Sequence, residues 1–82
     1  MSKMLITEKQ YSSLTPIGKE LHDYWMKFKP EMYKELAQMG SLWSLIEQQD
    51  KELDDMILQL IPQLGIAGAM EMARAEIYET MD

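Results

Sequence analysis

Apolar residues recur every three or four positions along most of this 82-residue chain, a spacing that places them on one face of an α-helix. The dipeptide Thr15-Pro16 predicts the first helix start, with the threonine as cap and the proline in the first turn. Pro30 lacks the N–H that a helix interior needs, so we predict that this helix ends near Lys29. Its apolar face consists of Ile17, Leu21, Tyr24, Trp25 and Phe28.

A short second helix is predicted from about residue 31 to residue 39, because Pro30 suits the first turn of a helix. Gly40 then occupies the position at which many helices end in the left-handed conformation that glycine adopts at little steric cost. We therefore predict a helical hairpin at Pro30. The apolar side of the second helix contains Met32, Tyr33, Leu36 and Ala37.

The longest apolar stripe predicts a third helix over residues 42–61. Pro62 is expected to kink or end it, and Gly65 and Gly68 loosen the chain that follows. A last amphipathic helix is predicted over residues 66–81. The third stripe contains Leu42, Ile46, Gln49, Leu53, Met56, Ile57, Leu60 and Leu64, and the last contains Ile66, Met70, Ala73, Ile77 and Met81.

Beyond the first few residues no segment alternates with a period of two, so the predicted fold class is all-α. We predict a small bundle of about four helices that forms a single domain over residues 15–82. Residues 1–14 lack a sustained helical period and are predicted to be extended or mobile. The positions expected to carry the fold are Tyr24, Phe28, Pro30, Tyr33, Leu36, Gly40 and Leu42.

The stretch YWMKFKPEMYK (residues 24–34) interleaves aromatic and basic residues, as nucleic-acid-binding grooves do. Its rings, however, fall on the predicted apolar stripes, and Glu31 and Glu35 offset the neighbouring lysines. We interpret Tyr24, Phe28 and Tyr33 as core residues at the corner between the first two helices.

Composition limits the class of protein further. Hydrophobic residues make up 46% of the chain, which excludes a disordered tail, and the absence of cysteine excludes a disulfide framework. A core this small needs tight helix packing or self-association. No apolar run approaches the roughly 18 residues of a membrane span, and the run Met4–Ile6 is too short for a signal sequence. We therefore expect a cytoplasmic protein without membrane contact.

The net charge of −6 is unevenly distributed along the chain. Residues 1–40 carry six lysines against five acidic residues, whereas residues 41–82 carry one lysine and one arginine against nine acidic residues. An acidic half repels nucleic-acid phosphates and attracts the basic surfaces of other proteins. Binding to nucleic acid is therefore not expected.

The residues that could carry chemistry form no recognised site. His22 is the only histidine, and without a second histidine or a cysteine we expect a surface or boundary side chain rather than a metal ligand. The run DKELDD (residues 50–55) spaces its acids as in a calcium loop, but Asp55 stands where that loop needs glycine and Ile61 where it needs an acid. No serine has an evident base, and no glycine-rich phosphate loop is present. We expect no catalytic residue, metal or cofactor, and no enzymatic activity.

Two groups of residues are predicted to contact a partner protein instead. Nine methionines are unusually many, and apolar residues that project away from the stripes suit a shape-tolerant binding surface. The exposed apolar candidates are Met26, Leu58 and Met72, and the candidate acidic face consists of Glu47, Asp50, Asp54 and Asp55. Arg74 is expected to extend its charged end to solvent or to pair with an acid of the long helix.

The run YWMKFKPEMYKELAQMGSLWSLI (residues 24–46) resembles a recurring pattern of the TnpV family of small transposon-encoded proteins. The matching positions are Tyr24, Pro30, Tyr33, Leu36, Gly40 and Leu42. The run EQQDKELDDMILQLI and the ending MARAEIYETM are similar to the later helices of that family, so the resemblance covers about residues 16–82. It implies a helical fold and a mobile-element or phage setting, and it supplies no catalytic residues.

Three functional hypotheses follow. The first is an acidic interaction protein without enzymatic activity. It binds and inhibits a nucleic-acid-handling host or defence protein through the basic surface of that protein, as anti-CRISPR and other anti-defence proteins often do. The second is an excisionase-like DNA-binding accessory factor that uses a helix-turn-helix, with lysines of the first 40 residues on the phosphates. The third is a structural homodimer within a larger complex, formed through the exposed apolar residues.

Overall fold

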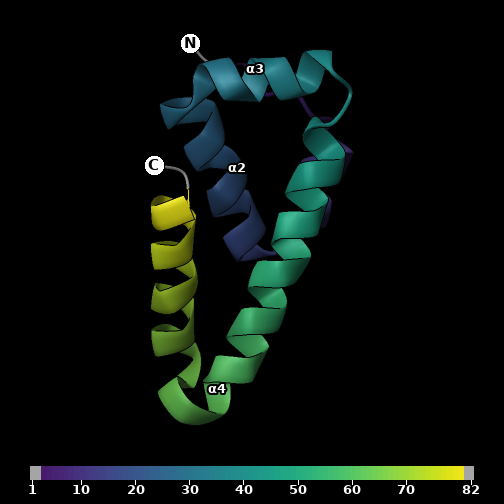
Figure 1. Cartoon of the computed structure of the whole chain (residues 1–82). Coiled ribbons are helices and arrows are strands. Elements are labelled where there is room, and N and C mark those ends of the chain that lie inside the picture. Colours follow the sequence, from purple (N-terminus) through teal and green to yellow (C-terminus); the bar gives the residue numbers. More distant parts are fainter. Residues whose placement is uncertain (1–2, 81–82) are drawn as a thin grey trace.

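The computed structural model describes residues 3–80, and every regular element in this range is a helix. α1 spans Glu8–Ser13, α2 Pro16–Phe28, α3 Pro30–Gln38 and α4 Leu42–Thr80 (Figure 1). The prediction of an all-α fold with about four helices is confirmed. Met81, which the pattern placed in the last helix, lies outside the described residues.

α4 is bent into a V (Figure 1). At the bend Gly65 has φ 74° and ψ 173°, a backbone conformation that is essentially restricted to glycine. We call residues 42–64 the first arm and residues 66–80 the second arm. The first arm continues through Pro62, so the predicted end at residue 61 is wrong. A proline removes one helical hydrogen bond, whereas the positive φ of Gly65 takes the chain out of the helix altogether.

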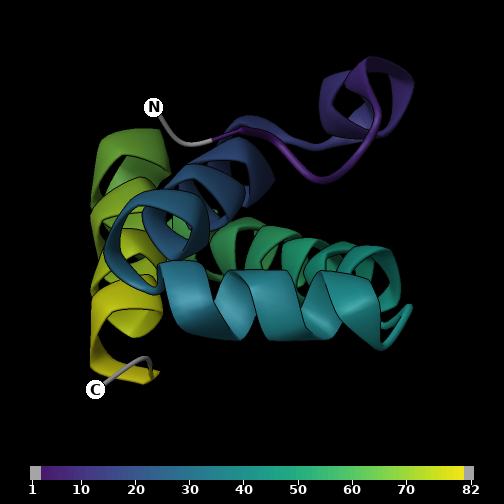
Figure 2. The same ribbon diagram turned by 90° about the horizontal axis from the view of Figure 1, so that it is seen from above.

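α2 lies between the two arms of α4 (Figure 1), and the arms provide its most extensive contacts. Figure 2 shows from above that α3 crosses beside α2 and that α1 lies at the edge of the molecule. Pro30 begins α3, and Gly40 has φ 75° between α3 and α4, as the sequence predicts. The N–H of Ser41 donates to the carbonyl of Leu36 (2.9 Å) and closes the end of α3.

One hydrophobic core joins the N-terminal segment, α2, α3 and both arms of α4. Burying each of its larger apolar side chains stabilises the fold by roughly 1.5–3 kcal/mol. Ala69 and Ala73 of the second arm are fully buried, and their small side chains allow this arm to approach α2 closely. The buried apolar residues are Ile6, Leu14, Ile17, Leu21, Trp25, Tyr33, Leu42, Ile46, Leu53, Ile57, Ala69, Ala73 and Ile77.

Part of the N-terminal segment is helical (α1), whereas the pattern predicted an extended or mobile stretch over residues 1–14. Thr7 and Gln10 form a capping box, in which the threonine hydroxyl accepts the Gln10 N–H (3.0 Å) and the glutamine side chain accepts the Thr7 N–H (2.9 Å). Ile6 and Leu14, on either side of α1, are buried in the core. A helix of six residues is too short to show a helical period, which is why the apolar pattern did not predict it.

The aromatic residues at the corner between α2 and α3 differ in exposure. Trp25 and Tyr33 are buried and Tyr24 is half-buried. Phe28 is 59% exposed, so its predicted place in the core is wrong. It is the last residue of α2, and its ring lies against that of Tyr24, with the two ring centres 5.1 Å apart, and under the ammonium group of Lys27.

We expect Gly65→Ala to lower the free energy of unfolding by about 1–3 kcal/mol, because alanine adopts this backbone conformation only with strain. No atom lies within 4 Å of the new Cβ position, so the loss would come from the backbone alone. Urea unfolding followed by circular dichroism measures the change. The control is a synthetic protein with D-alanine at this position, for which positive φ is favoured and wild-type stability is expected. Equal stability of the two alanine proteins would contradict the role of Gly65.

Candidate functional site

A buried polar network links the N-terminal segment to α2 and α3. His22 is fully buried, so its predicted surface or boundary position is wrong. Its Nε2 lies 2.7 Å from the hydroxyl of Tyr33, and its Nδ1 lies 3.0 Å from a carboxylate oxygen of Asp23. The Tyr33 hydroxyl also accepts the N–H of Leu5 (2.8 Å). With neutral histidine every group is satisfied if Tyr33 donates to Nε2 and Nδ1–H donates to Asp23.

The same network accounts for the raised pKa values of two tyrosine hydroxyls. Burial raises the pKa of Tyr33 above its ordinary value of 10.0; the N–H of Leu5 opposes this shift, and the charge of Asp23 adds to it. The pKa of Tyr11 is also raised, by burial first and then by its hydrogen bond to Asp23. Both ring nitrogens of His22 have protein partners within the fold, so this array holds the N-terminal segment in place.

A second polar cluster joins the start of α2 to the first arm of α4. Asp50, predicted to belong to the acidic face, is only 7% exposed, so its assignment to a partner surface is wrong. Its carboxylate accepts the hydroxyl (2.5 Å) and the N–H (3.3 Å) of Thr15. The hydroxyl of Thr15 in turn accepts the N–H of Gly18 (3.3 Å) and caps α2. A negative charge at this end of α2 also favours the helix dipole.

The other predicted acidic residues remain at the surface of the first arm. Glu47 and Asp55 are exposed and Asp54 is half-buried. Asp54 lies seven residues after Glu47, and Leu58 lies four residues after Asp54, so these three share one side of the helix. The acidic face therefore runs toward the bend of α4 and ends beside an apolar side chain.

Large apolar side chains before and after the bend of α4 are exposed to solvent. Leu58, Leu64 and Ile66 are 58%, 48% and 68% exposed, and every residue from 62 to 67 is exposed. α2 lies between the arms near the open end of the V and stops short of the bend (Figure 1). We call Leu58, Leu64 and Ile66 the bend patch.

The other two predicted apolar contact residues are not part of the bend patch, although Met72 lies seven residues after Gly65 just as Leu58 lies seven residues before it. Met72, on the second arm, is 52% exposed. Met26 is half-buried, contrary to its predicted exposure, because it packs against the core and lines a cleft with residues of the N-terminal segment and α3. Met26 and Leu58 therefore do not belong to one surface.

Arg74 pairs with an acid of α2, whereas the sequence led us to expect that it would extend its charged end to solvent or pair with an acid of the long helix. Its Nε donates to both carboxylate oxygens of Glu20 at 3.0 and 2.9 Å. The two side chains are 43% and 41% exposed, so the pair contributes only about 0.2–1 kcal/mol. Together with the edge-on contact between the rings of Tyr78 and Tyr24 (4.9 Å), it fixes the second arm against α2.

α4 is also apolar enough to meet the usual requirements of a membrane span. An 18-residue window within Leu42–Glu79 has a mean hydropathy of 1.3, and 17% of this window is buried. This differs from the expectation that no run approaches the length of a span. Core helices of soluble proteins meet the same requirements, and here the helix is bent at Gly65. Vesicle binding is therefore one outcome that a functional test must distinguish.

Within residues 3–80, no group of three or more histidine, cysteine or acidic side chains is placed to bind a metal ion. The chain matches no protein-family model, no curated protein and no solved structure. The resemblance to the TnpV family therefore stays an expectation from the sequence, and function has to be inferred from the geometry.

We expect Tyr33→Phe to lower the free energy of unfolding at neutral pH by about 1–3 kcal/mol, because Leu5 N–H and His22 Nε2 lose their partner. The raised pKa of Tyr33 means that the folded state resists ionisation. The stabilisation that the Tyr33 hydroxyl provides is complete below pH 10.0, the pKa of tyrosine in the unfolded chain. This stabilisation is lost as the pH rises through the higher pKa of Tyr33 in the folded protein. Urea midpoints measured from pH 7 to above pH 10 should therefore converge for wild type and variant.

The control for this experiment is Tyr78→Phe, at a tyrosine that is half exposed. Its free energy of unfolding should stay within about 0.5 kcal/mol of the wild-type value at neutral pH. If Tyr33→Phe behaved like Tyr78→Phe, the buried network would not hold the N-terminal segment.

Asp50→Ala is expected to destabilise the fold by about 1–3 kcal/mol, because Thr15 loses the acceptor of two hydrogen bonds. Asp55→Ala, on the exposed side of the same arm, should change stability by about 0.5 kcal/mol or less. A Cβ at Gly18 would collide with the Asp50 carboxylate, so Gly18→Ala should cost more in wild type than in Asp50→Ala. Additive effects in this double-mutant cycle would contradict the contact.

Proposed function

We propose that this protein acts without enzymatic activity, by binding and inhibiting a protein whose own ligand is nucleic acid. The observation that carries the proposal is the bend patch, whose large apolar side chains lie exposed and whose first member, Leu58, lies one helical turn after the acidic residues Asp54 and Asp55. Apolar clusters edged by polar residues are typical of protein-binding surfaces. The bend is also the part of α4 that α2 leaves uncovered (Figure 1).

The negative charge of the second half of the chain supports a partner with a basic surface. Nine acidic residues lie in the second half of the chain against one lysine and one arginine, and Glu47, Asp54 and Asp55 follow the first arm toward the bend patch. Proteins that bind nucleic acid present basic surfaces for phosphates. An acidic helix face that occupies such a surface would exclude the phosphates by direct competition.

The resemblance to the TnpV family adds a setting to this proposal. A mobile element or phage meets host nucleases, recombinases and defence proteins, all of which handle nucleic acid. Inhibition of one of them, in the manner of anti-CRISPR and other anti-defence proteins, needs no active site in the inhibitor. It needs a surface that fits the partner, which the acidic face and the bend patch supply.

The test starts from immobilised protein and a lysate of the source organism. Each captured protein is purified, and its binding to nucleic acid is measured with and without added wild-type protein. We expect wild-type protein to displace the nucleic acid, and the affinity of the two proteins to fall between about 50 and 300 mM salt. Leu58→Ser with Ile66→Ser, and separately Glu47→Lys with Asp55→Lys, should each weaken binding by at least about tenfold.

The matched control reverses the same number of charges elsewhere. Glu31→Lys with Glu35→Lys alters two exposed acids of α3 and should leave the affinity unchanged. A partner that still binds its nucleic acid in the complex would contradict inhibition by competition. A partner bound equally by all variants would contradict the assigned surface.

Two further measurements identify other occupants of the bend patch. Light scattering at about 100 μM detects self-association, and a dimer that Ile66→Asp dissociates would show that a second copy covers the patch. Sedimentation with anionic lipid vesicles detects membrane binding by the apolar window of α4. Either result would replace the proposed partner.

A further inference from the structure

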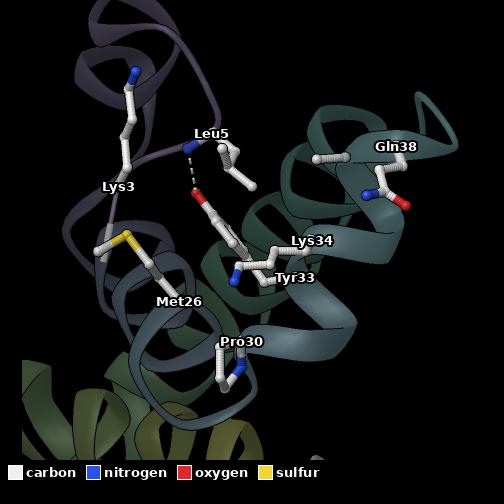
Figure 3. Close-up of a pocket in the computed structure, with 8 residues that line it drawn as sticks. Lys3, Leu5, Met26, Pro30, Tyr33, Lys34 and Gln38 are labelled. Atoms are coloured by element: carbon white, nitrogen blue, oxygen red, sulfur yellow. Dashed lines mark hydrogen bonds between the residues drawn. The ribbon is translucent and has the colours of Figure 1, made fainter. Parts of the chain in front are cut away.

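A cleft of about 780 Å³ opens between the N-terminal segment, the end of α2 and α3 (Figure 3). Its volume lies within the usual range of small-molecule sites, about 300–1,000 Å³. The cleft is at the open end of the V, whereas the bend patch is at the closed end (Figure 1). The two features are therefore separate, and an inference from the cleft does not depend on the proposed function.

Apolar side chains from three elements line the cleft. Leu5 comes from the N-terminal segment, Met26 from α2 and Pro30 from α3 (Figure 3). Ala37 of α3 also lines the cleft. Met26 is half-buried, and its flexible thioether can adapt to ligands of different shape. A ligand that fills this space needs an apolar body.

The wall that carries Leu5 is fixed within the protein before any ligand binds. The Tyr33 hydroxyl accepts the N–H of Leu5 (2.8 Å), shown as a dashed line in Figure 3, and lies 2.7 Å from Nε2 of His22. Because these two contacts engage the hydroxyl, Tyr33 positions the wall and does not need to contact the ligand. A preformed wall reduces the entropy that binding would otherwise lose.

The charged residues that line the cleft are both lysines. Lys3 stands on the N-terminal wall and Lys34 on α3 (Figure 3), and both are exposed. In the described part of the chain, neither ammonium group lies in an ion pair with a carboxylate. Among the described residues no acidic side chain lines the cleft, although the chain as a whole carries a net charge of −6. This local excess of positive charge favours an anion.

We propose that the cleft binds a small organic anion. The apolar body of the ligand contacts Leu5, Met26 and Ala37, and its carboxylate or phosphate pairs with the ammonium group of Lys34, which points toward Met26 and Tyr33 (Figure 3). The side chain of Lys3 points away from Lys34 in Figure 3 and would turn toward the cleft to reach the same group. Gln38, which also lines the cleft, offers an amide N–H to the same anionic group. A cleft whose charged lining residues are lysines selects against neutral and cationic molecules with the same apolar body.

Isothermal titration calorimetry with four probes tests the chemistry. Decanoate and decyl phosphate, used below their micelle concentrations, share an apolar body and differ in the anionic group, so they show which group the lysines prefer. We expect at least one of them to bind with one-to-one stoichiometry. Decyltrimethylammonium has the wrong charge and inorganic phosphate has no apolar body, so we expect neither to bind.

Variants of the cleft locate the site. Lys34→Met keeps an unbranched side chain one atom shorter, removes its charge, and should weaken binding by about tenfold or more. Ala37→Trp should abolish binding by filling the cleft. The matched controls are Lys51→Met, on the exposed side of α4, and Ile66→Ser in the bend patch, and both should bind as wild type does. Circular dichroism identifies any variant that fails to fold.

Three results would overturn the proposal. The first is equal binding of the anionic and cationic decyl compounds, which would show that the lysines do not select the ligand. The second is unchanged affinity of Lys34→Met, a surface change that the fold should tolerate. The third is backbone amide shifts in NMR spectra that cluster at the bend of α4 and not at Leu5, Lys34 and Ala37.

Discussion

The carboxylate of Asp50 holds the start of α2 against the first arm of α4, and the position of α2 depends on this contact. The carboxylate accepts both the hydroxyl and the N–H of Thr15, the residue that caps α2. Gly18 has no side chain to separate the two helices, and even one carbon atom there would collide with Asp50. With its start fixed in this way, α2 places Ile17, Leu21 and Trp25 in the space between the arms. A buried charge is stable here because its hydrogen bonds are made at the N-terminus of a helix.

The second arm and the N-terminal segment are held on α2 by further contacts of different strength. The second arm approaches through fully buried alanines and an exposed ion pair between Arg74 and Glu20, so packing contributes more than charge. The N-terminal segment depends on the buried bonds among Leu5, Tyr33 and His22, each of which would leave an unsatisfied group if broken. These interior polar groups fix the fold and leave two distinct surfaces, an acidic and apolar one at the bend and a cationic cleft at the open end.

Local signals in the sequence predicted much of the fold. Proline, glycine and a capping threonine act on their own backbone, so the helix starts at residues 16 and 30 and the turn at Gly40 follow from the residues alone. The errors concern residues whose position depends on distant partners. Asp50 looks like any surface acid until Thr15 is placed beside it, 35 residues away. His22 looks exposed until the rings of Tyr11 and Tyr33 pack against it. The cleft could not be predicted for the same reason, because its lysines come from segments that meet only in the folded chain.

Leaving the bend patch exposed lowers the stability of the fold, and this loss bears on the role of the patch. A chain of 82 residues has few large apolar side chains, and each one left in water forgoes roughly 1.5–3 kcal/mol of stabilisation. Leu58, Leu64 and Ile66 could be covered only by lengthening α2 or shortening the arms, and the arms instead extend beyond the core (Figure 1). At Gly65 itself, no atom outside its chain neighbours lies within 4 Å of the place where a side chain would begin. A projecting, uncovered apolar end beside an acidic face is poorly suited to stabilising the isolated chain and well suited to contact with a partner that covers it.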